Sequence, residues 1–504
     1  MTMAVQRLSA VRHAHRRLGE ERPIRQLLYA LYATILVAVI AGFPLAWGLA
    51  EYLSQPDSVA VLTAISTPHA VAVCCGLGLA GLTVAGSVRG PALRSPFLVT
   101  VLAGNDLPRS RSLRGPFLAA TATVVGVCVI TAVTIGGVLA TAGQASTLAV
   151  VKFAAAAALF ASLGGVFWLG GQVCDRGRAW AVTAVLATIT LTTSAVPEWA
   201  SFSPWGWVSL LWPSSASGSW WPLLLLALAA GGALALVPRL LNLLRSPALL
   251  HQSQRWHVAG LATATADFAG ALATYRAAPG LGRHWRAIAD APLPLVYLRR
   301  DLVTALRTPG RLIAATAFLL VAGFLIACGA AAGVGWVAVA AGAAVGFMAL
   351  GVGSDGFRHA AATAGSPPLF RTSTGRLFLL HALFPCLWGG LGMVGGAVIA
   401  QIALGASNGW GTAGIIAFFL LTVRAYDSAK GLLPPILLTP SPSPAGDLTG
   451  LIVLAWQADA LIIATAVPSL LVATAGGSAA ALIVRGALII AALVLLTKRR
   501  LRRR

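Results

Sequence analysis

The sequence predicts an all-α, polytopic membrane protein with about twelve transmembrane helices, and three observations support this fold class. Apolar residues make up 58% of the 504 positions and charged residues only 10%, whereas soluble domains carry about 25% charged residues. Twelve stretches approach the length of about 20 mostly apolar residues that a helix needs to cross a bilayer. The basic residues also lie almost entirely on one side of those stretches. This composition excludes an ordinary soluble enzyme, a disordered chain and a disulfide scaffold.

The twelve predicted spans form two sets of six, separated by a polar, basic segment. The first six are residues 27–50, 67–87, 117–141, 147–172, 179–197 and 220–238. The second six are residues 312–332, 334–353, 378–404, 411–426, 450–473 and 478–497. The tenth span is the weakest, because its short apolar run continues into Arg424, Asp427 and Lys430.

The charge distribution predicts the orientation of these spans. The chain has 36 Lys and Arg against 14 Asp and Glu, a net charge of +22. If the N-terminus is cytoplasmic, 34 of the 36 basic residues fall in cytoplasmic segments, and the exceptions are Lys152 and Arg485. Cytoplasmic loops collect Lys and Arg in this way. We therefore expect both termini to be cytoplasmic, a lipid bilayer as the environment and no nucleic-acid partner.

The same pattern divides the chain into five parts. They are a basic cytoplasmic N-terminal segment (1–26), a first six-span half (27–238), a cytoplasmic linker with a connector helix (239–311), a second six-span half (312–497) and a basic cytoplasmic tail (498–504). In the connector, Leu295, Leu298, Leu302 and Leu306 share one helical face, which is typical of an amphipathic helix at the membrane interface.

A short repeated motif indicates that the two halves arose by duplication. The stretch LPRSRSLRGPF begins at Leu107 and LFRTSTGRLFL begins at Leu369. Aligned without gaps, they match Arg109 with Arg371 and Arg114 with Arg376. Each copy precedes the third span of its half on the predicted cytoplasmic side. With six spans in each half, the repeats would have the same orientation, as parallel repeats do.

Motifs for catalysis and cofactor binding are missing from the sequence. No G-x-x-x-x-G-K-[ST] loop, HExxH motif, Cys/His cluster or G-x-S-x-G turn occurs. The external loops carry no paired carboxylates of the kind that a glycosyl-transferring enzyme would use. We therefore expect a protein that is not an enzyme and that binds no cofactor or metal itself.

Charged residues inside the predicted spans are the first candidates for a functional site. Asp459 lies in the eleventh span, Arg485 in the twelfth and Lys152 in the fourth. For the two basic residues, snorkelling to the outer interface is the simpler interpretation. Asp459 is either part of a contact between helices, with Arg485 as one possible partner, or a substrate or proton site.

The loop between the fifth and sixth spans is rich in tryptophan. It contains Trp199, Trp205, Trp207, Trp212, Trp220 and Trp221. Because tryptophan favours the headgroup level of a membrane, we expect this loop to lie at the outer leaflet. Its role is either simple anchoring or a part in gating or substrate handling, for which Trp205, Trp207, Trp220 and Trp221 are the candidates.

Several stretches resemble type-2 ABC exporter permeases of actinobacteria. SPWGW from Ser203, followed by WWPLLLL from Trp220, is similar to that group's loop between the fifth and sixth spans. RRDLVTALRTPGRL from Arg299 is similar to its connector before a first span, and the segment from Arg89 to Phe117 to its loop after the second span. The first half lacks the R-D-L connector, and the second half lacks the tryptophan-rich loop.

The resemblance implies a fused permease subunit in a bacterial cytoplasmic membrane. Separate ABC ATPase subunits would bind and hydrolyse ATP and dock on coupling helices within residues 95–106 and 355–370. Arg109, Arg114, Arg371 and Arg376 would flank these docking surfaces.

Two other functions fit the same spans. A secondary transporter of the major facilitator type has twelve spans too, and Gly170 to Trp180 shares part of its G-x-x-x-D-R-x-G-R signature. That match lacks one residue and follows the fourth span instead of the second. A membrane scaffold or assembly factor without transport activity is the third possibility.

Overall fold

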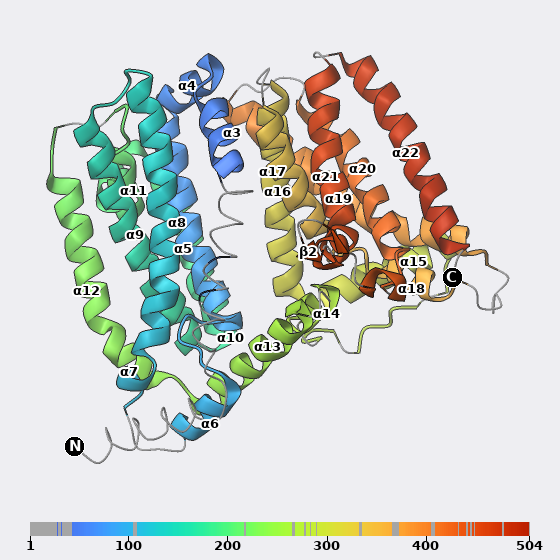
Figure 1. Ribbon diagram of the computed structural model, residues 1–504, viewed down its shortest axis with the longest axis horizontal. Coiled ribbons are helices and arrows are strands. Elements are labelled where there is room, and N and C mark those ends of the chain that lie inside the picture. The colour runs from blue at the N-terminus through green and yellow to red at the C-terminus, as the bar shows by residue number, and fades with distance from the viewer. Residues whose placement is uncertain are drawn as a thin grey trace. The chain divides into compact units, whose positions relative to one another are not determined.

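The computed structural model is almost entirely helical (Figure 1). It describes residues 28, 32, 43–103, 108–215, 218–264, 268–276, 279–282, 284–288, 290–331, 335–364, 372–404, 409–431, 433–439, 442–443, 446–447, 449–475 and 478–502. The chain divides into two compact units, Met1–Gly260 and Leu261–Arg504. The all-α prediction is confirmed, apart from one pair of two-residue antiparallel strands, β1 (Pro442–Ser443) and β2 (Gly446–Asp447).

The first unit combines long helices with shorter ones that lie between some of them. They are α3 (Phe43–Leu53), α4 (Pro56–Thr63), α5 (Thr67–Val88), α6 (Pro96–Ala103), α7 (Arg109–Ser112), α8 (Arg114–Thr141), α9 (Thr147–Val173), α10 (Arg176–Ala195), η3 (Pro197–Phe202), α11 (Pro204–Leu210), α12 (Trp221–Leu243) and α13 (Ser246–Ala264). The predicted segment 1–26 and most of the first span, 27–50, lie outside the described residues.

The second unit also combines long helices with shorter ones. Its elements are α14 (Phe268–Ala273), α15 (Leu293–Leu306), α16 (Pro309–Ala331), α17 (Trp336–Leu350), α18 (Asp355–Ala362), α19 (Thr374–Leu404), α20 (Gly409–Ser428), η4 (Pro435–Leu438), the two strands, α21 (Thr449–Ala475) and α22 (Ala479–Leu501). The predicted connector helix is α15, in which Leu295 and Leu302 are exposed while Val303 and Ala305 are buried.

The protein is a multi-pass membrane protein by the length and hydropathy of its helices. Among the described residues, nine helices are long and apolar enough to cross a membrane: α5, α8, α9, α12, α16, α19, α20, α21 and α22. A tenth candidate is α17 with α18, a pair bent by 63°. The predicted fifth span forms a helix, α10, but α10 is not among these candidates. The prediction of twelve spans is therefore supported for nine or ten of them.

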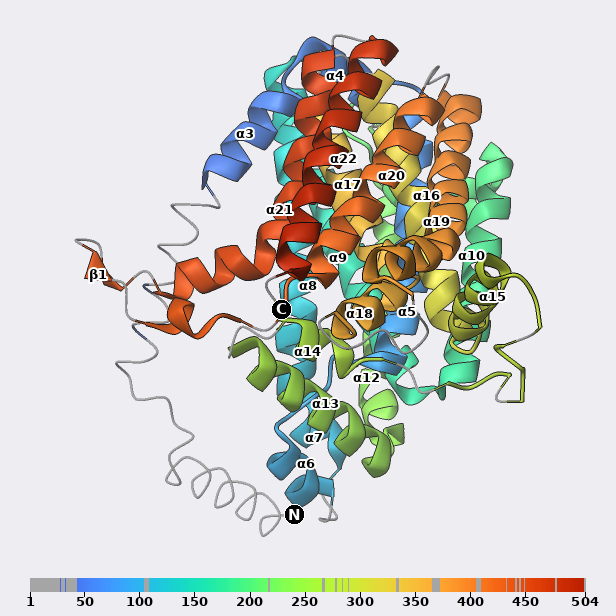
Figure 2. The ribbon, with the colours of Figure 1, turned by 90° about the vertical axis from the view of Figure 1, so that its right-hand side faces the viewer.

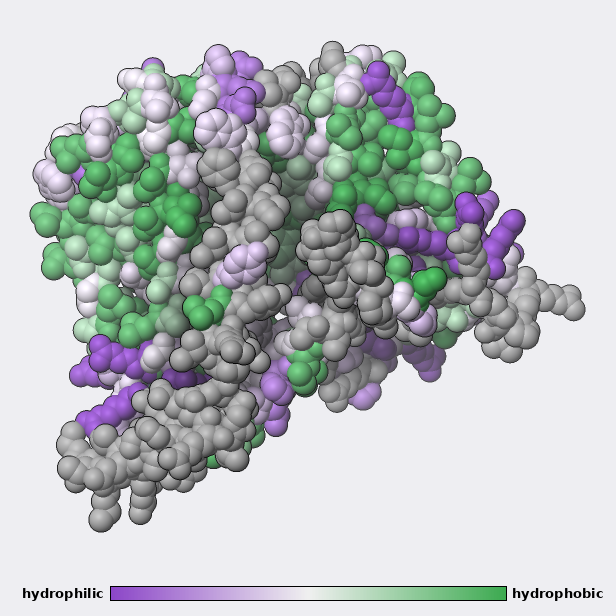
Figure 3. All heavy atoms as spheres, viewed as in Figure 1, coloured by the Kyte–Doolittle hydropathy of each residue, from purple (hydrophilic) through white to green (hydrophobic). Residues whose placement is uncertain are grey.

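Apolar side chains cover the outward faces of the long helices, as lipid contact requires. Leu224 and Leu228 on α12 are exposed, and so are Leu488 and Leu495 on α22. In Figure 3 hydrophobic residues cover the flanks of the helices that are in view, while hydrophilic residues gather near the end where α22 finishes. A soluble protein would bury such faces, so these helices are suited to a bilayer.

The long helices of the two units have the same neighbours. In the first unit α5 packs on α9 and α10, α8 on α9, and α9 on α12. In the second unit α17 packs on α20 and α21, α19 on α20, and α20 on α22. When each helix is numbered by its predicted span within its half, both units have the same packed pairs. These pairs are second with fourth, second with fifth, third with fourth, and fourth with sixth.

Glycines allow the helices of each unit to approach until their backbones touch. A Cβ atom added to Gly396 on α19 would lie 1.9 Å from the carbonyl oxygen of Leu320 on α16. One added to Gly171 on α9 would lie 1.9 Å from the carbonyl oxygen of Thr83 on α5. Small residues at such crossings are a general source of stability for helix pairs in membranes.

Alanine substitutions on α19 should therefore have opposite effects at two glycines. Gly396→Ala should destabilise the protein by about 1–3 kcal/mol, because the new methyl group meets backbone that has no room to move. Gly390→Ala should be neutral or slightly stabilising, because no atom lies within 4 Å of its added Cβ and alanine is the better helix former. Thermal unfolding in detergent measures both, and equal effects would contradict the close crossing.

Candidate functional site

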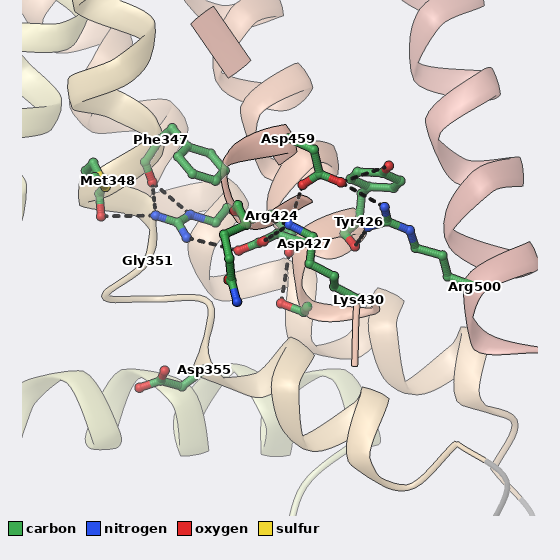
Figure 4. Close-up of polar contacts among 12 residues, drawn as sticks. Phe347, Met348, Gly351, Asp355, Arg424, Tyr426, Asp427, Lys430, Asp459 and Arg500 are labelled. Atoms are coloured by element: carbon green, nitrogen blue, oxygen red, sulfur yellow. Dashed lines mark hydrogen bonds and ion pairs between the residues drawn. The ribbon is translucent and has the colours of Figure 1, made fainter. Parts of the chain in front are cut away.

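A buried arginine binds the end of a broken helix in the second unit (Figure 4). Arg424 on α20 is 9% exposed. Its Nε atom donates a hydrogen bond of 2.8 Å to the carbonyl oxygen of Phe347, and Nη2 donates to Phe347 and Met348. These carbonyls belong to the last turn of α17, where helical hydrogen bonding ends, and the Met348 carbonyl also accepts from the Gly351 amide at 3.2 Å. A cation also suits the negative end of the helix dipole.

The geometry around Arg424 fixes the bend between α17 and α18. The guanidinium carbon lies 3.7 Å from the centre of the Phe347 ring, and Nη1 lies 3.6 Å from a carboxylate oxygen of Asp427, one turn further along α20. A Cβ atom on Gly351 would lie 2.9 Å from Arg424 Nη2, so the turn after α17 passes against the guanidinium. Together these contacts fix the point at which the chain leaves α17 for α18.

The short helix α18 is connected to its surroundings by a second set of charges. Asp355, in its first turn, accepts a hydrogen bond of 3.0 Å from Arg276 and lies 3.6 Å from Arg311 at the start of α16. Phe357 stacks on Phe378 of α19 with ring centres 5.5 Å apart. The helix is therefore joined to the linker and to two long helices.

A histidine and an aspartate join the connector helix to the same region. His381 Nδ1 on α19 lies 2.8 Å from Asp301 Oδ2 on α15; the His381 side chain is buried and that of Asp301 is mostly buried. The Tyr297 ring meets the His381 ring edge-on at 4.8 Å. A Cβ atom on Gly356 of α18 would lie 2.2 Å from His381 Nδ1, so α15, α18 and α19 meet at this histidine.

Asp459, on α21, lies in an ionic cluster at the ends of α20 and α22 (Figure 4). Its carboxylate forms ion pairs with Lys430, just after α20, and with Arg500 near the end of α22, the latter at 2.8 Å. Arg500 also stacks on the Tyr426 ring, 3.7 Å from its centre. Arg485, one possible partner from the sequence, does not pair with Asp459. It is exposed and donates a 2.7 Å hydrogen bond to the carbonyl oxygen of Thr474 at the end of α21.

The length of α21 accounts for why Asp459 pairs with residues near the ends of α20 and α22 and not with one at mid-membrane. α21 has 27 residues and so is about 40 Å long, longer than the bilayer core of about 30 Å. A residue about ten positions from the start of such a helix need not lie at mid-membrane. In Figure 2 the first part of α21 runs sideways before the rest follows the other helices of its unit.

The first unit has a counterpart to Arg424 in two buried glutamines. Gln172, near the end of α9, accepts a hydrogen bond of 3.2 Å from the Ala92 amide, and Gln252 on α13 accepts one of 3.2 Å from Gly90. The two side chains bond to each other at 3.1 Å. They satisfy the turn that follows α5 and leads to α6. In both units, a polar side chain of the fourth predicted span thus binds the backbone at the exit of the second.

The four arginines predicted to flank docking surfaces differ in their surroundings. Arg109 is half-buried and donates a 2.7 Å hydrogen bond to Ser246 on α13. Arg114 and Arg376 are exposed at the starts of α8 and α19. Arg371 lies outside the described residues. The structure contains the short helices α6 and α18 within the predicted segments 95–106 and 355–370.

The tryptophan-rich segment is only partly a surface loop. Trp205 and Trp212 are 6% and 2% exposed, so they are packed inside the unit and not at its surface. Trp212 donates a 2.9 Å hydrogen bond to the Leu62 carbonyl oxygen, and half-buried Trp207 donates one of 2.7 Å to Ser201. Trp220 and Trp221 are exposed, as membrane anchoring predicts.

Lys152 does not extend to the surface as snorkelling predicts. Its side chain is buried and donates a 2.9 Å hydrogen bond to the carbonyl oxygen of Gly218. Within the described residues, no group of three or more His, Cys, Asp or Glu side chains is placed to bind a metal ion.

Comparison with known proteins does not identify a family for this chain. No protein family matches the sequence, and no curated protein or solved structure is detectably similar to it.

Replacing Arg424 by methionine should loosen the exit of α17. The substitution leaves the Phe347 carbonyl without its charged partner and Asp427 with Lys430 alone, and losing such hydrogen bonds costs about 2–3 kcal/mol. Amide exchange should rise across Gly351 and α18. Arg358→Met, which removes an exposed cation from α18, is the control and should leave exchange there unchanged. Slow exchange in both variants would contradict the assigned role of Arg424.

Neutralising Asp459 tests the ionic cluster. Asp459→Asn places Lys430 and Arg500 near each other without their shared carboxylate, so it should lower the free energy of unfolding by about 1–3 kcal/mol. Adding Arg500→Gln should restore part of the loss. Arg485→Met should have little effect in the same unfolding measurement. A loss for Arg485→Met equal to that for Asp459→Asn would instead favour a pair between those two residues.

Proposed function

We propose that this chain is the permease subunit of an ABC-type exporter, moving a substrate across the cytoplasmic membrane with ATP hydrolysed by separate partner subunits. The observation that carries the proposal is a short helix after the second predicted span of each half. In both halves, polar side chains bind the backbone at the end of that span. These helices are α6 in the first unit and α18 in the second.

The repeated helix neighbours support two equivalent halves. Both units pair the second predicted span with the fourth and fifth, and the fourth with the sixth. Arg424 and Gln172, each in the last part of the fourth predicted span of its half, both bind backbone near the end of the second. A chain duplicated in this way provides two related surfaces, which suits a pair of ATPase subunits. Under this proposal the chain has twelve spans in two parallel repeats, and both termini are cytoplasmic.

The contacts of α18 suit a helix that transmits force. Asp355 connects it to Arg311 on α16, and Phe357 connects it to Phe378 on α19. Arg424 connects α20 to the turn before it. A push on α18 would therefore reach three long helices without passing through a flexible linker.

In the proposed mechanism, ATP binding closes the two ATPase subunits and moves α6 and α18. Each half then tilts its long helices, and the substrate path changes its exposure from the cytoplasmic to the external side. The bilayer lies around α12 and α22, whose exposed leucines face lipid. The exposed Arg114 and Arg376 provide positive charge beside the docking helices.

ATP hydrolysis by a reconstituted complex tests the proposal. The full-length chain is tagged, purified from its native membrane and placed in lipid nanodiscs with the ATPase that accompanies it. ATPase activity should depend on the permease chain. Arg376→Glu should reduce it several-fold by placing a negative charge beside α18. Arg485→Met, a change of charge at the opposite end of the second half, should leave the activity unchanged.

The same preparation separates the exporter from the alternatives. Proton-coupled flux by the purified chain alone in liposomes, without any ATPase, would contradict the exporter proposal and favour a secondary transporter. A chain that associates with no nucleotide-hydrolysing subunit and moves no substrate would favour a membrane scaffold.

A further inference from the structure

Lys152 is a buried cation whose role the proposed transport mechanism does not explain. It lies in the second turn of α9 and is only 3% exposed. Its Nζ atom donates to the Gly218 carbonyl oxygen at 2.9 Å and lies 4.2 Å from the centre of the Trp220 ring. The tryptophan-rich segment thus covers this lysine.

Charge compensation distinguishes Lys152 from the buried cations of the second unit. Arg424 lies 3.6 Å from Asp427, and Lys430 pairs with Asp459. In the described part of the chain, no carboxylate lies within the 4.0 Å ion-pair distance of Lys152. A carbonyl oxygen and an aromatic ring offset only part of the cost of burying a charge, so the site has capacity for an anion.

The start of α12 adds to the attraction for an anion. Trp220 is the residue preceding α12, and no side chain caps this helix. By contrast, α9 is capped by the Ser146 hydroxyl, which accepts from the Ala149 amide. The first turn of a helix carries partial positive charge and amide groups that favour phosphate; in α12 Pro222 lacks an N–H, so Trp221 and Leu223 supply the amides. Lys152 supplies a full charge beside that turn, through its contact with Trp220.

An apolar path begins at the same place. Trp221, Leu224 and Leu228 follow one face of α12 and are all exposed. On α9, Leu148 and Val151 are exposed next to Lys152. A ligand that fits both features has an anionic head for the lysine and a hydrocarbon tail for the leucines.

We propose that Lys152, Trp220 and the start of α12 bind the phosphate headgroup of an anionic phospholipid, with its acyl chains along the exposed face of α12. Because Trp220 lies over the buried Lys152, binding of the phosphate requires the Trp220 ring to turn aside. The site is independent of the proposed export function, because it requires only the bilayer.

Lipid retention measures this site directly. The full-length chain is purified with phosphatidylglycerol and then diluted into detergent, and the bound lipid is counted by native mass spectrometry. Lys152→Met should weaken retention of one phosphatidylglycerol by about tenfold or more, the usual effect of losing one charge-assisted hydrogen bond. Lys152→Arg should retain the lipid, because it keeps the charge. Phosphatidylcholine should bind weakly to every variant.

A cation in the second unit provides the matched control. Arg485 also lies near the start of its helix, but it is exposed and already bound to the Thr474 carbonyl oxygen. Arg485→Met should not change retention. Equal retention by the original protein and Lys152→Met, or an equal loss in Arg485→Met, would overturn the proposal.

If Lys152→Met folds poorly, the change in unfolding temperature on adding lipid to the other variants provides an independent test. Phosphatidylglycerol should raise the unfolding temperature of the original protein and of Lys152→Arg, but the rise should be smaller for Trp220→Ala. Stabilisation by inorganic phosphate alone would assign the site to a soluble phosphate compound and overturn the lipid assignment. Identical stabilisation of Trp220→Ala and the original protein would exclude the assigned role of Trp220.

Discussion

The structure of the second unit depends on how the end of α17 is satisfied. This helix has only 15 residues, about 22 Å, so its backbone ends before it has crossed a bilayer core of about 30 Å. Carbonyl groups at such an end need partners, because lipid supplies none. Amides of the turn after α17, from Gly351 to Gly353, bind its last three carbonyls, and Arg424 of the neighbouring helix α20 binds the Phe347 carbonyl. The direction of α18 and its contacts with α16 and α19 follow from that choice of partner.

The first unit meets the same requirement with neutral chemistry. Gln172 and Gln252 bind the turn after α5, and their amides offer both donors and acceptors to a backbone that needs both. The exit of the second long helix is therefore a fixed point in each unit. The close crossing at Gly171 ties the end of α5 to α9, and Gly389 of α19 lies against Leu350 at the end of α17. Each unit thus couples a short helix outside the long helices to several of those helices at once.

Much of the fold follows from residue periodicity and charge, but the polar contacts do not. Spans such as 117–141 and 147–172 match α8 and α9 closely, because long apolar runs bounded by polar turns leave little choice of structure. The sequence of α10 predicts its environment less clearly, because its many threonines allow a helix without making it strongly apolar. The first span lies mostly outside the described residues.

Side-chain partners depend on helix packing, which one sequence does not reveal. Asp459 was identified as a candidate, but its pairing with Lys430 and Arg500 requires α20, α21 and α22 to meet at one level. From the sequence alone, Arg424 is one of the basic residues assigned to the cytoplasmic side. Its position at the end of an apolar run, GTAGIIAFFLLTVR, was the available sign of a special role. Burial of Trp205 and Trp212 likewise depends on α11 entering between the long helices.

The most direct test of the account is the accessibility of α18 in the assembled complex. Arg358 is exposed on this helix, so Arg358→Cys provides a thiol for a membrane-impermeant reagent after the six native cysteines are replaced. If α18 docks an ATPase, labelling should be fast in the isolated chain, slow in the complex, and dependent on ATP. Equal labelling with and without the ATPase, whatever the nucleotide, would contradict the account.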